Sequence, residues 1–236
     1  MTPDIPCCAR CLYRLLWPVL LLLTLALLAE LLQLDLMVAD WIHRASGNTW
    51  SLRDAWLTRG LLHEGGRNLV ALLLVALLVT LAASYWYTPL RGWRRGLVYL
   101  LVSALLAGLA VNVLKRLTHV DCPWDLLRYG GDYPYVGLFE AHPDTFRYGA
   151  CFPAGHASAG YSWLGLYFLV RDRLPRWRWL ALGVVVMMGA AFGVAQQLRG
   201  AHFLSHDLWT LALCWGVAVM AYVAFRCRLG PAPAQN

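Results

Sequence analysis

The chain has 236 residues, of which 60% are hydrophobic and only 14% are charged, and its formal net charge is +7. A soluble domain carries roughly a quarter charged residues, so the composition excludes an ordinary soluble enzyme and predicts an integral membrane protein. The arginines stand in short clusters between apolar runs, as topology signals do. There is no basic stripe interleaved with aromatic residues, so we expect no nucleic-acid partner.

Six apolar runs follow one another along the chain. They are residues 12–34, 68–87, 97–114, 157–170, 179–196 and 208–225. A transmembrane helix takes about 20 residues, and no signal-peptide cleavage pattern follows the first run, which we interpret as a retained anchor. The polar connection 37–67 contains tryptophans, which favour a short interfacial helix. We therefore predict an all-α integral membrane protein with six transmembrane helices in one bundle, forming a single membrane domain over residues 1–236.

Arginine distribution predicts the orientation. The connections 89–96 and 171–178 are basic, whereas the long polar segment 116–155 mixes both signs. By the positive-inside rule, both termini are cytoplasmic, including the N-terminal segment 1–11, and segment 116–155 faces outward. The short loops and the arginine bias suggest a bacterial inner membrane with a periplasmic site. The tail 229–236 is expected to be flexible, and the sequence carries no signal for the oligomeric state.

One stretch organises the rest: the sequence CFPAGHASAG at residues 151–160. Pro and Gly interrupt the preceding segment, and the small residues allow a closely packed helix start. Because a helix N-terminus favours an anion, Ala154 and Gly155 are candidates for phosphate binding. His156 is placed to donate a proton. The alternative is a glycine-rich turn with a surface histidine.

Six spans bring three polar clusters to the same outer face: Lys115, His156, and the segment 199–207. Within that segment Arg199, His202 and His206 are spaced i, i+3 and i+7, and they share one face if the segment is helical. Lysine and arginine suit a phosphate or pyrophosphate group. One histidine can attack phosphorus and another can protonate the leaving oxygen. The alternative is a set of unrelated interfacial histidines at loop ends.

With these motifs in this order, residues 97–225 resemble the type 2 phosphatidic acid phosphatase superfamily. That family combines a lysine and arginine-proline motif, a Pro-Ser-Gly-His motif, and a motif of serine-arginine, histidine and aspartate. The resemblance implies six membrane helices with a site at the outer interface. It also implies metal-independent hydrolysis of lipid phosphates or pyrophosphates, with no cofactor.

The resemblance assigns roles residue by residue. Lys115 matches the lysine of the first motif. The run Pro-Ala-Gly-His ending at His156 matches the second motif with alanine in place of serine, and His156 would protonate the leaving group. His202 matches the nucleophile of the third motif, in the context Gly-x-His-Phe-x-Ser.

Besides this alanine, three positions depart from the family pattern. Cys122 stands where the first motif has arginine, and Arg128 or Arg147 are candidates to supply that charge. Gln196, six residues before His202, stands where the third motif has arginine, and Arg199 lies nearby. His206 stands where the third motif has the aspartate that orients the nucleophile. Asp207 is one residue later, so either His206 or Asp207 is the candidate for that role.

Two cysteines of the long polar segment flank the first two motifs. Cys122 and Cys151 would form a disulfide in an oxidising periplasm; the alternative is two free thiols too far apart to bridge. The N-terminal cysteines, Cys7, Cys8 and Cys11, lack the further ligands of a zinc site.

The resulting hypothesis is a lipid phosphatase that acts through a phospho-histidine. Phosphatidic acid, phosphatidylglycerol phosphate, undecaprenyl pyrophosphate and a lipid A phosphate are all candidate substrates. Two alternatives stay open: a lipid phosphotransferase that uses the same intermediate, and a non-enzymatic transporter or binder of anionic lipids with a degenerate site.

Overall fold

The computed structural model describes residues 9–140 and 149–229, and within these ranges it contains helices and no β-strand. The main helices are α1 (Ala9–Leu31), α2 (Leu34–Ala45), the π-helix η1 (Trp56–Gly65), α3 (Gly66–Ala83), α4 (Thr88–Arg91), α5 (Arg94–Thr118), α6 (Gly155–Tyr161), α7 (Gly165–Arg173), α8 (Arg178–Leu198) and α9 (Leu204–Leu229). Short 3₁₀ turns are η2 (Pro123–Asp125), η3 (Leu127–Tyr129), η4 (Ser162–Leu164) and η5 (Pro175–Trp177). The predicted flexible tail lies almost wholly outside the described residues.

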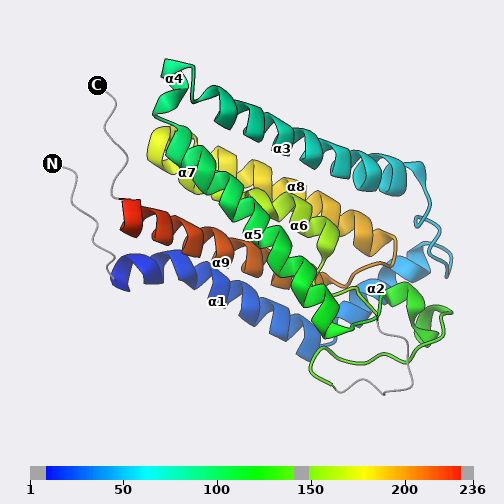
Figure 1. Cartoon of the computed structure of the whole chain (residues 1–236). Coiled ribbons are helices and arrows are strands. Elements are labelled where there is room, and N and C mark those ends of the chain that lie inside the picture. Colours follow the sequence, from blue (N-terminus) through cyan, green and yellow to red (C-terminus); the bar gives the residue numbers. More distant parts are fainter. Residues whose placement is uncertain (1–8, 141–148, 230–236) are drawn as a thin grey trace.

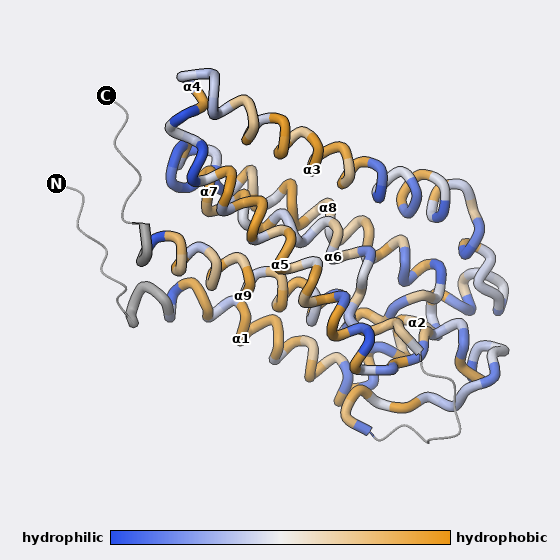
Figure 2. Tube along the Cα trace, viewed as in Figure 1, coloured by the Kyte–Doolittle hydropathy of each residue, from blue (hydrophilic) through white to orange (hydrophobic). Residues whose placement is uncertain are grey.

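Five helical stretches are long and apolar enough to cross a membrane. They are Tyr13–Leu31, Trp56–Ala83, Arg94–Asp125, Pro175–Leu198 and Leu204–Arg226. In Figure 2 the hydrophobic residues occupy the middle of the bundle, and hydrophilic residues collect towards its two ends. Large apolar side chains such as Leu72, Leu105 and Met220 are more than half exposed. An outer surface of this kind is suited to lipid, and the protein is a multi-pass membrane protein.

The predicted run 157–170 has a different form from the others. It is built from α6, η4 and α7, which follow one another without a gap, so it is not one of the five long helices. The whole segment is about 28 Å long, close to the roughly 30 Å of a hydrocarbon core. Gly160 of α6 faces Gly189 of α8 so closely that a Cβ atom at either position would clash. The expected close packing of small residues is present here.

The connection 37–67 contains more helix than the sequence predicts. Its first part continues α2, and its second part is η1, which runs directly into α3. A ten-residue π-helix is uncommon, and such segments often occur at functional sites. When η1 is counted with it, the second membrane stretch therefore begins at Trp56, about three helical turns before its predicted start at residue 68.

The helices form one bundle in which α9 is central. It packs along α1 and α5 and also contacts α6, while α8 packs against α6 and α3 lies on the outside against η1 and α5. Figure 1 shows that α1 begins and α9 ends at the same end of the bundle. Buried Phe168, Leu164, Val185 and Val219 fill the centre. The Tyr99 hydroxyl donates to the Ala218 carbonyl at 3.0 Å and fastens α5 to α9.

A sharp turn separates α8 from α9. Gly200 has a φ of +74°, its N–H donates to Gln197 O at 2.9 Å, and the N–H of Ala201 donates to Gln196 O at 2.8 Å. This pattern is a Schellman motif, which ends a helix. The expectation that Arg199, His202 and His206 share one helical face is therefore wrong. Only His206 lies on α9, and the glycine turn reverses the chain before His202.

Candidate active site

The candidate residues collect at one end of the bundle. The end of α5, the start of α6, the end of α8 and the start of α9 meet there, opposite the end where α1 begins (Figure 1). Helix ends at the boundary of a bundle are where charged and polar groups can be placed with least cost in a membrane. The topology therefore brings Lys115, His156 and His202 to the same region, as the sequence predicts.

Lys115 lies against the first residue of α6. Its Nζ atom is 3.1 Å from the position that a Cβ atom on Gly155 would occupy. A larger residue at position 155 would push the ammonium group away. Within the residues that the structure describes, no carboxylate forms an ion pair with Lys115. This positive charge is therefore available to an anion at the start of α6.

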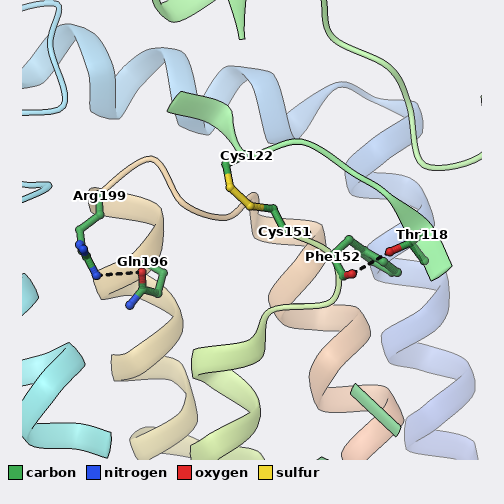
Figure 3. The surroundings of a disulfide bond; sticks show 6 residues. All are labelled: Thr118, Cys122, Cys151, Phe152, Gln196 and Arg199. Atoms are coloured by element: carbon green, nitrogen blue, oxygen red, sulfur yellow. Dashed lines mark hydrogen bonds between the residues drawn. A yellow bond between two sulfur atoms is a disulfide. The ribbon is translucent and has the colours of Figure 1, made fainter. Parts of the chain in front are cut away.

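Three hydrogen bonds fix the turn that precedes α6. Thr118 Oγ1 of α5 donates to Phe152 O at 2.8 Å (Figure 3). The N–H of Ala154 donates to Thr210 Oγ1 at 2.8 Å, and Thr210 Oγ1 donates to His206 O at 2.7 Å. The turn is thus attached to both α5 and α9. Because the Ala154 N–H is used internally, the next residue, Gly155, is the better candidate for binding phosphate through its backbone.

The structure joins Cys122 and Cys151 in a disulfide, with Cα atoms 5.2 Å apart (Figure 3). This separation is within the usual range for such a bond. The Cys151 N–H also donates to Val120 O at 2.9 Å. The backbone of Cys151 interacts with both His202 and His206. The disulfide therefore fixes the backbone that the two histidine side chains contact.

His202 and His206 form a buried pair, with 7% and 4% of their surfaces exposed. Their ring centroids are 5.9 Å apart in an edge-to-face arrangement. Among the described residues, neither Nδ1 atom has a hydrogen-bond partner. Burial, together with the nearby positive charge of Lys115 and the neighbouring histidines, lowers the pKa of His202 well below 6.5. His202 is therefore neutral at neutral pH and has a free lone pair, which a nucleophile requires.

His156 contacts η1. Its Nε2 atom is 2.9 Å from Leu62 O and must donate, because a carbonyl oxygen only accepts. Its ring lies 4.4 Å from the ring of His63 and 4.8 Å from that of Phe192, centroid to centroid. His156 is also near enough to His202 to influence the pKa of that residue. The structure thus brings the predicted proton donor and the predicted nucleophile to the same end of the bundle.

Gln196 and Arg199 form a polar chain at the end of α8. Arg199 Nη1 donates to Gln196 Oε1 at 3.2 Å (Figure 3), and Arg199 Nε donates to Arg53 O at 2.7 Å. The Gln196 amide nitrogen lies 2.8 Å from His63 Nδ1. Both Gln196 and Arg199 are buried. Arg199 is therefore bound to neighbouring groups of this chain at two of its nitrogens.

These groups follow one another in the chain as a lysine near the end of one helix, a Gly-His helix start and a histidine before the last helix. One family model, that of the PAP2 superfamily, matches residues 96–228, which include all three groups. The chain belongs to the PAP2 superfamily. No curated protein and no solved structure matches the chain. PAP2 proteins are in general phosphatases, and the family suggests phosphoesterase activity on lipid-like substrates.

Asp207 does not face the histidine that corresponds to the PAP2 nucleophile. Its Oδ2 atom accepts from Gln197 Nε2 at 2.5 Å, and the carboxylate packs on Gly193 of α8. Since Asp207 follows His206 by one residue on α9, the helix turns it by about 100° towards α8. His206, at the aspartate position of the PAP2 pattern, is the residue that contacts the His202 ring.

Of the two arginines proposed to supply the charge missing at Cys122, Arg128 is already paired with a carboxylate. Arg128 forms a two-pronged ion pair with Asp40, with N–O distances of 2.8 and 2.6 Å. The guanidinium lowers the pKa of Asp40 through these hydrogen bonds. The charge of Arg128 is thus used by Asp40 of α2, and Arg147 lies outside the described residues.

Two residues from outside the PAP2 match reach the site and were not predicted. The ring of His63 of η1 packs against the ring of His156 at an angle of 48°. Asp35 of α2 is 3% exposed, accepts from the Ser205 N–H at 2.8 Å and accepts from Ser205 Oγ at 2.5 Å. Burial raises the pKa of Asp35 despite these bonds. The signal for Asp35 was present in the sequence, because a carboxylate beside an apolar run needs a partner.

An apolar cavity of about 420 Å³ lies next to the second motif. Phe152 and Pro153, immediately before the Ala-Gly-His turn, form part of its wall, and Thr118 and Trp209 line the same side. Residues of α1, including Val19 and Leu23, form the opposite wall. The cavity therefore lies among α1, α5 and α9, beside the groups that would bind a phosphate.

Proposed function

We propose that this PAP2 protein is a metal-independent phosphatase that removes phosphate from a membrane lipid phosphate or pyrophosphate through a phospho-histidine at His202. The observation that carries the proposal is the grouping of Lys115, Gly155 and His202. The Lys115 ammonium, which no described carboxylate pairs, lies against a helix start, and its charge helps to keep the buried His202 neutral. Together they provide an anion site and a nucleophile.

In the proposed first step, a lone pair of His202 attacks phosphorus and a P–N bond forms as the P–O bond to the lipid breaks. His156 enters this step protonated on both nitrogens and gives the Nδ1 proton to the leaving oxygen, while Nε2–H keeps its bond to Leu62 O. Lys115 and the Gly155 N–H neutralise the charge on the phosphoryl oxygens, where such groups contribute most. In the second step water attacks phosphorus and gives a proton to His156. The P–N bond breaks, inorganic phosphate leaves and neutral His202 is restored.

The other two candidates of the third motif, His206 and Asp207, are proposed to position the nucleophile and its helix. His206 packs edge-to-face on His202 and is proposed to hold that ring in place. A neutral histidine stabilises an imidazolium less well than a carboxylate does. Asp207 is proposed to act at longer range, by joining α9 to α8 through Gln197. We therefore expect a slower reaction than a complete His-Asp pair would give.

The apolar cavity supports a lipid substrate. Its lining is almost wholly aliphatic and aromatic, and it reaches the second motif at Phe152 and Pro153. A hydrocarbon chain in this space would have its phosphate at the start of α6. Burial of each methylene group contributes about 0.8 kcal/mol, so a chain of even modest length adds substantially to binding.

Two observations support an outer-face site with six spans. The basic clusters of the connections between α3 and α5 and between α7 and α8 lie at the end of the bundle away from the site, as the positive-inside rule requires for a cytoplasmic end. The disulfide lies at the site end, as expected for an oxidising compartment. We propose that α6, η4 and α7 together form the sixth crossing, that the termini are cytoplasmic and that the site is periplasmic in a bacterial inner membrane.

The test is phosphate release by the purified protein in detergent with excess chelator, on phosphatidic acid, phosphatidylglycerol phosphate, undecaprenyl pyrophosphate and a lipid A phosphate. His202→Ala is the test variant. His43→Ala is the matched control, because His43 is at the same end of the bundle but stacks on Trp50 and Tyr129. We expect release that survives chelation, is lost in His202→Ala and persists in His43→Ala.

Other results would redirect the proposal. Release that is equal in His202→Ala would remove the phospho-histidine mechanism. No release from folded protein, but transfer of labelled phosphate to a second lipid, would identify a phosphotransferase. Binding of anionic lipid with neither reaction would identify a non-enzymatic lipid binder.

A further inference from the structure

His63 belongs to a part of the chain that no motif covers. It lies on η1, which packs against α8 and precedes the family match at residues 96–228. Its ring is 4.4 Å from that of His156, centroid to centroid, and the adjoining residue Leu62 accepts the hydrogen bond from His156. The π-helix therefore meets the site through two consecutive residues.

Gln196 connects His63 to the third motif. This glutamine stands six residues before His202, where the family pattern has an arginine. It is 3% exposed, and both ends of its amide are used. A phosphate site that loses an arginine loses a donor with a positive charge. An uncharged amide whose nitrogen and oxygen each already have a partner does not restore that charge.

The hydrogen-bond chain determines which nitrogen of His63 carries the proton. A guanidinium only donates, so the atom of Gln196 that faces Arg199 at 3.2 Å is the carbonyl oxygen. The amide nitrogen therefore faces His63 Nδ1 at 2.8 Å and donates to it. Since Nδ1 accepts, neutral His63 carries its proton on Nε2. Gln196 thus holds His63 as an Nε2–H donor.

We propose that His63 is a phosphate-binding residue that supplies, through Nε2–H, the contact that the third-motif arginine makes in the family pattern. The inference rests on the proposed function and adds a ligand to that site. Arg199 orients Gln196, Gln196 orients His63, and His63 beside His156 donates to a phosphoryl oxygen. The loss of one arginine is compensated from η1, a different element.

Two substitutions separate phosphate binding from a purely structural role. In His63→Asn, the side-chain oxygen can replace Nδ1 as the acceptor for Gln196, but no donor remains near the Nε2 position. In His63→Gln, the longer side chain brings an amide N–H to about the Nε2 position. A phosphate ligand requires the second property, whereas a structural link between η1 and α8 requires the first.

The probe is inorganic phosphate, measured by equilibrium dialysis of the full-length protein in detergent, together with KM for the lipid substrate. We expect His63→Asn to weaken phosphate binding about ten- to hundred-fold, the range for a lost hydrogen bond to a charged group. We expect His63→Gln to weaken it less than ten-fold, and His43→Ala to leave it unchanged. Thermal unfolding of each variant reports its folding.

A second test asks whether an arginine at position 196 can replace His63. In the double variant His63→Ala with Gln196→Arg, the arginine returns to its motif position, and we expect tighter phosphate binding than in His63→Ala alone. Equal binding in wild type, His63→Asn and His63→Gln would overturn the inference. Retention in His63→Asn but not in His63→Gln would assign His63 a structural role only.

The inference and the proposed function fail in different ways. Wild-type protein that neither binds phosphate nor hydrolyses a lipid phosphate would overturn both. Wild-type protein that is active and depends on His202, but is indifferent to His63, would overturn only the role of His63.

Discussion

Replacing Asp35 by alanine tests how the start of α9 is held. The carboxylate accepts from the N–H and the Oγ–H of Ser205, and it lies in the interior. Hydrogen bonds to a charged group contribute about 1.5–3 kcal/mol each, but burial of the carboxylate offsets part of this. We therefore expect Asp35→Ala to lower the free energy of unfolding by about 3 kcal/mol. For a chain of this size that corresponds to a Tm lower by roughly 6–12 °C.

The assay is thermal unfolding in one detergent at neutral pH. Asp132→Ala is the control, because Asp132 is an exposed carboxylate in the loops at the same end. Ser205→Ala and the double variant complete a cycle, in which we expect the two losses to be clearly less than additive because both residues make the same contacts. A Tm for Asp35→Ala within about 2 °C of the control, roughly 0.5 kcal/mol, would refute the reasoning. Additive losses would show that the two side chains do not stabilise each other.

Three further outcomes are expected. Burial lowers the pKa of His202 from 6.5, so the unfolded chain binds more protons than the folded protein below that pH. The free energy of unfolding therefore falls as the pH drops below about 6.5, and in unfolding measurements over a series of pH values we expect a shallower fall for His202→Gln. Equal pH slopes for wild type and variant would contradict this. Cys122→Ser, like reduction of the disulfide to Cys151, opens a loop with a sequence separation of 29. The chain-entropy relation predicts that the free energy of unfolding falls by about 3–4 kcal/mol. An unchanged Tm would count against the disulfide. Gly216→Leu fills the apolar cavity, since a Cβ there meets only Val19 at 3.8 Å. We expect it to raise KM roughly ten-fold for long-chain lipid phosphates and little for short-chain ones, with Gly108→Leu as the control. Equal effects on both substrates would show that the cavity does not bind the substrate chain.

The helical class and most of the spans are predictable from the sequence, because long apolar runs are a strong signal. The run 157–170 shows the limit of that signal. Hydropathy records its length and polarity, but the short helices α6 and α7 and the 3₁₀ turn between them depend on local backbone geometry and packing at Gly160. The π-helical form of η1 cannot be predicted from hydropathy either, since the polar residues of this segment resemble those of a loop and its packing against α8 is not recorded in the sequence.

Prediction of which candidate residues lie together agrees with the structure where topology alone decides. A lysine ending one span and a Gly-His start of the next meet because consecutive helices reverse direction. It failed where a turn redirects the chain: helical spacing placed Arg199 with His202, but positive φ at Gly200 separates them. The sequence signals that Asp35 needs a partner, but the partners of Asp35 and His63 cannot be identified from it, because they lie more than a hundred residues away.

The contact between Asp35 and Ser205 constrains how the protein is made. The two residues are 170 positions apart. Because the chain is synthesised at about 5–20 residues per second, Ser205 is added about ten to thirty seconds after Asp35. Until α9 is inserted beside α1, α2 carries a carboxylate with neither donor in place, near the membrane surface. We therefore expect the nascent protein to be most susceptible to quality-control proteases in this interval. A chain that ends before α9 would retain this defect permanently, so we expect C-terminal truncations to be degraded rather than to accumulate as partial bundles.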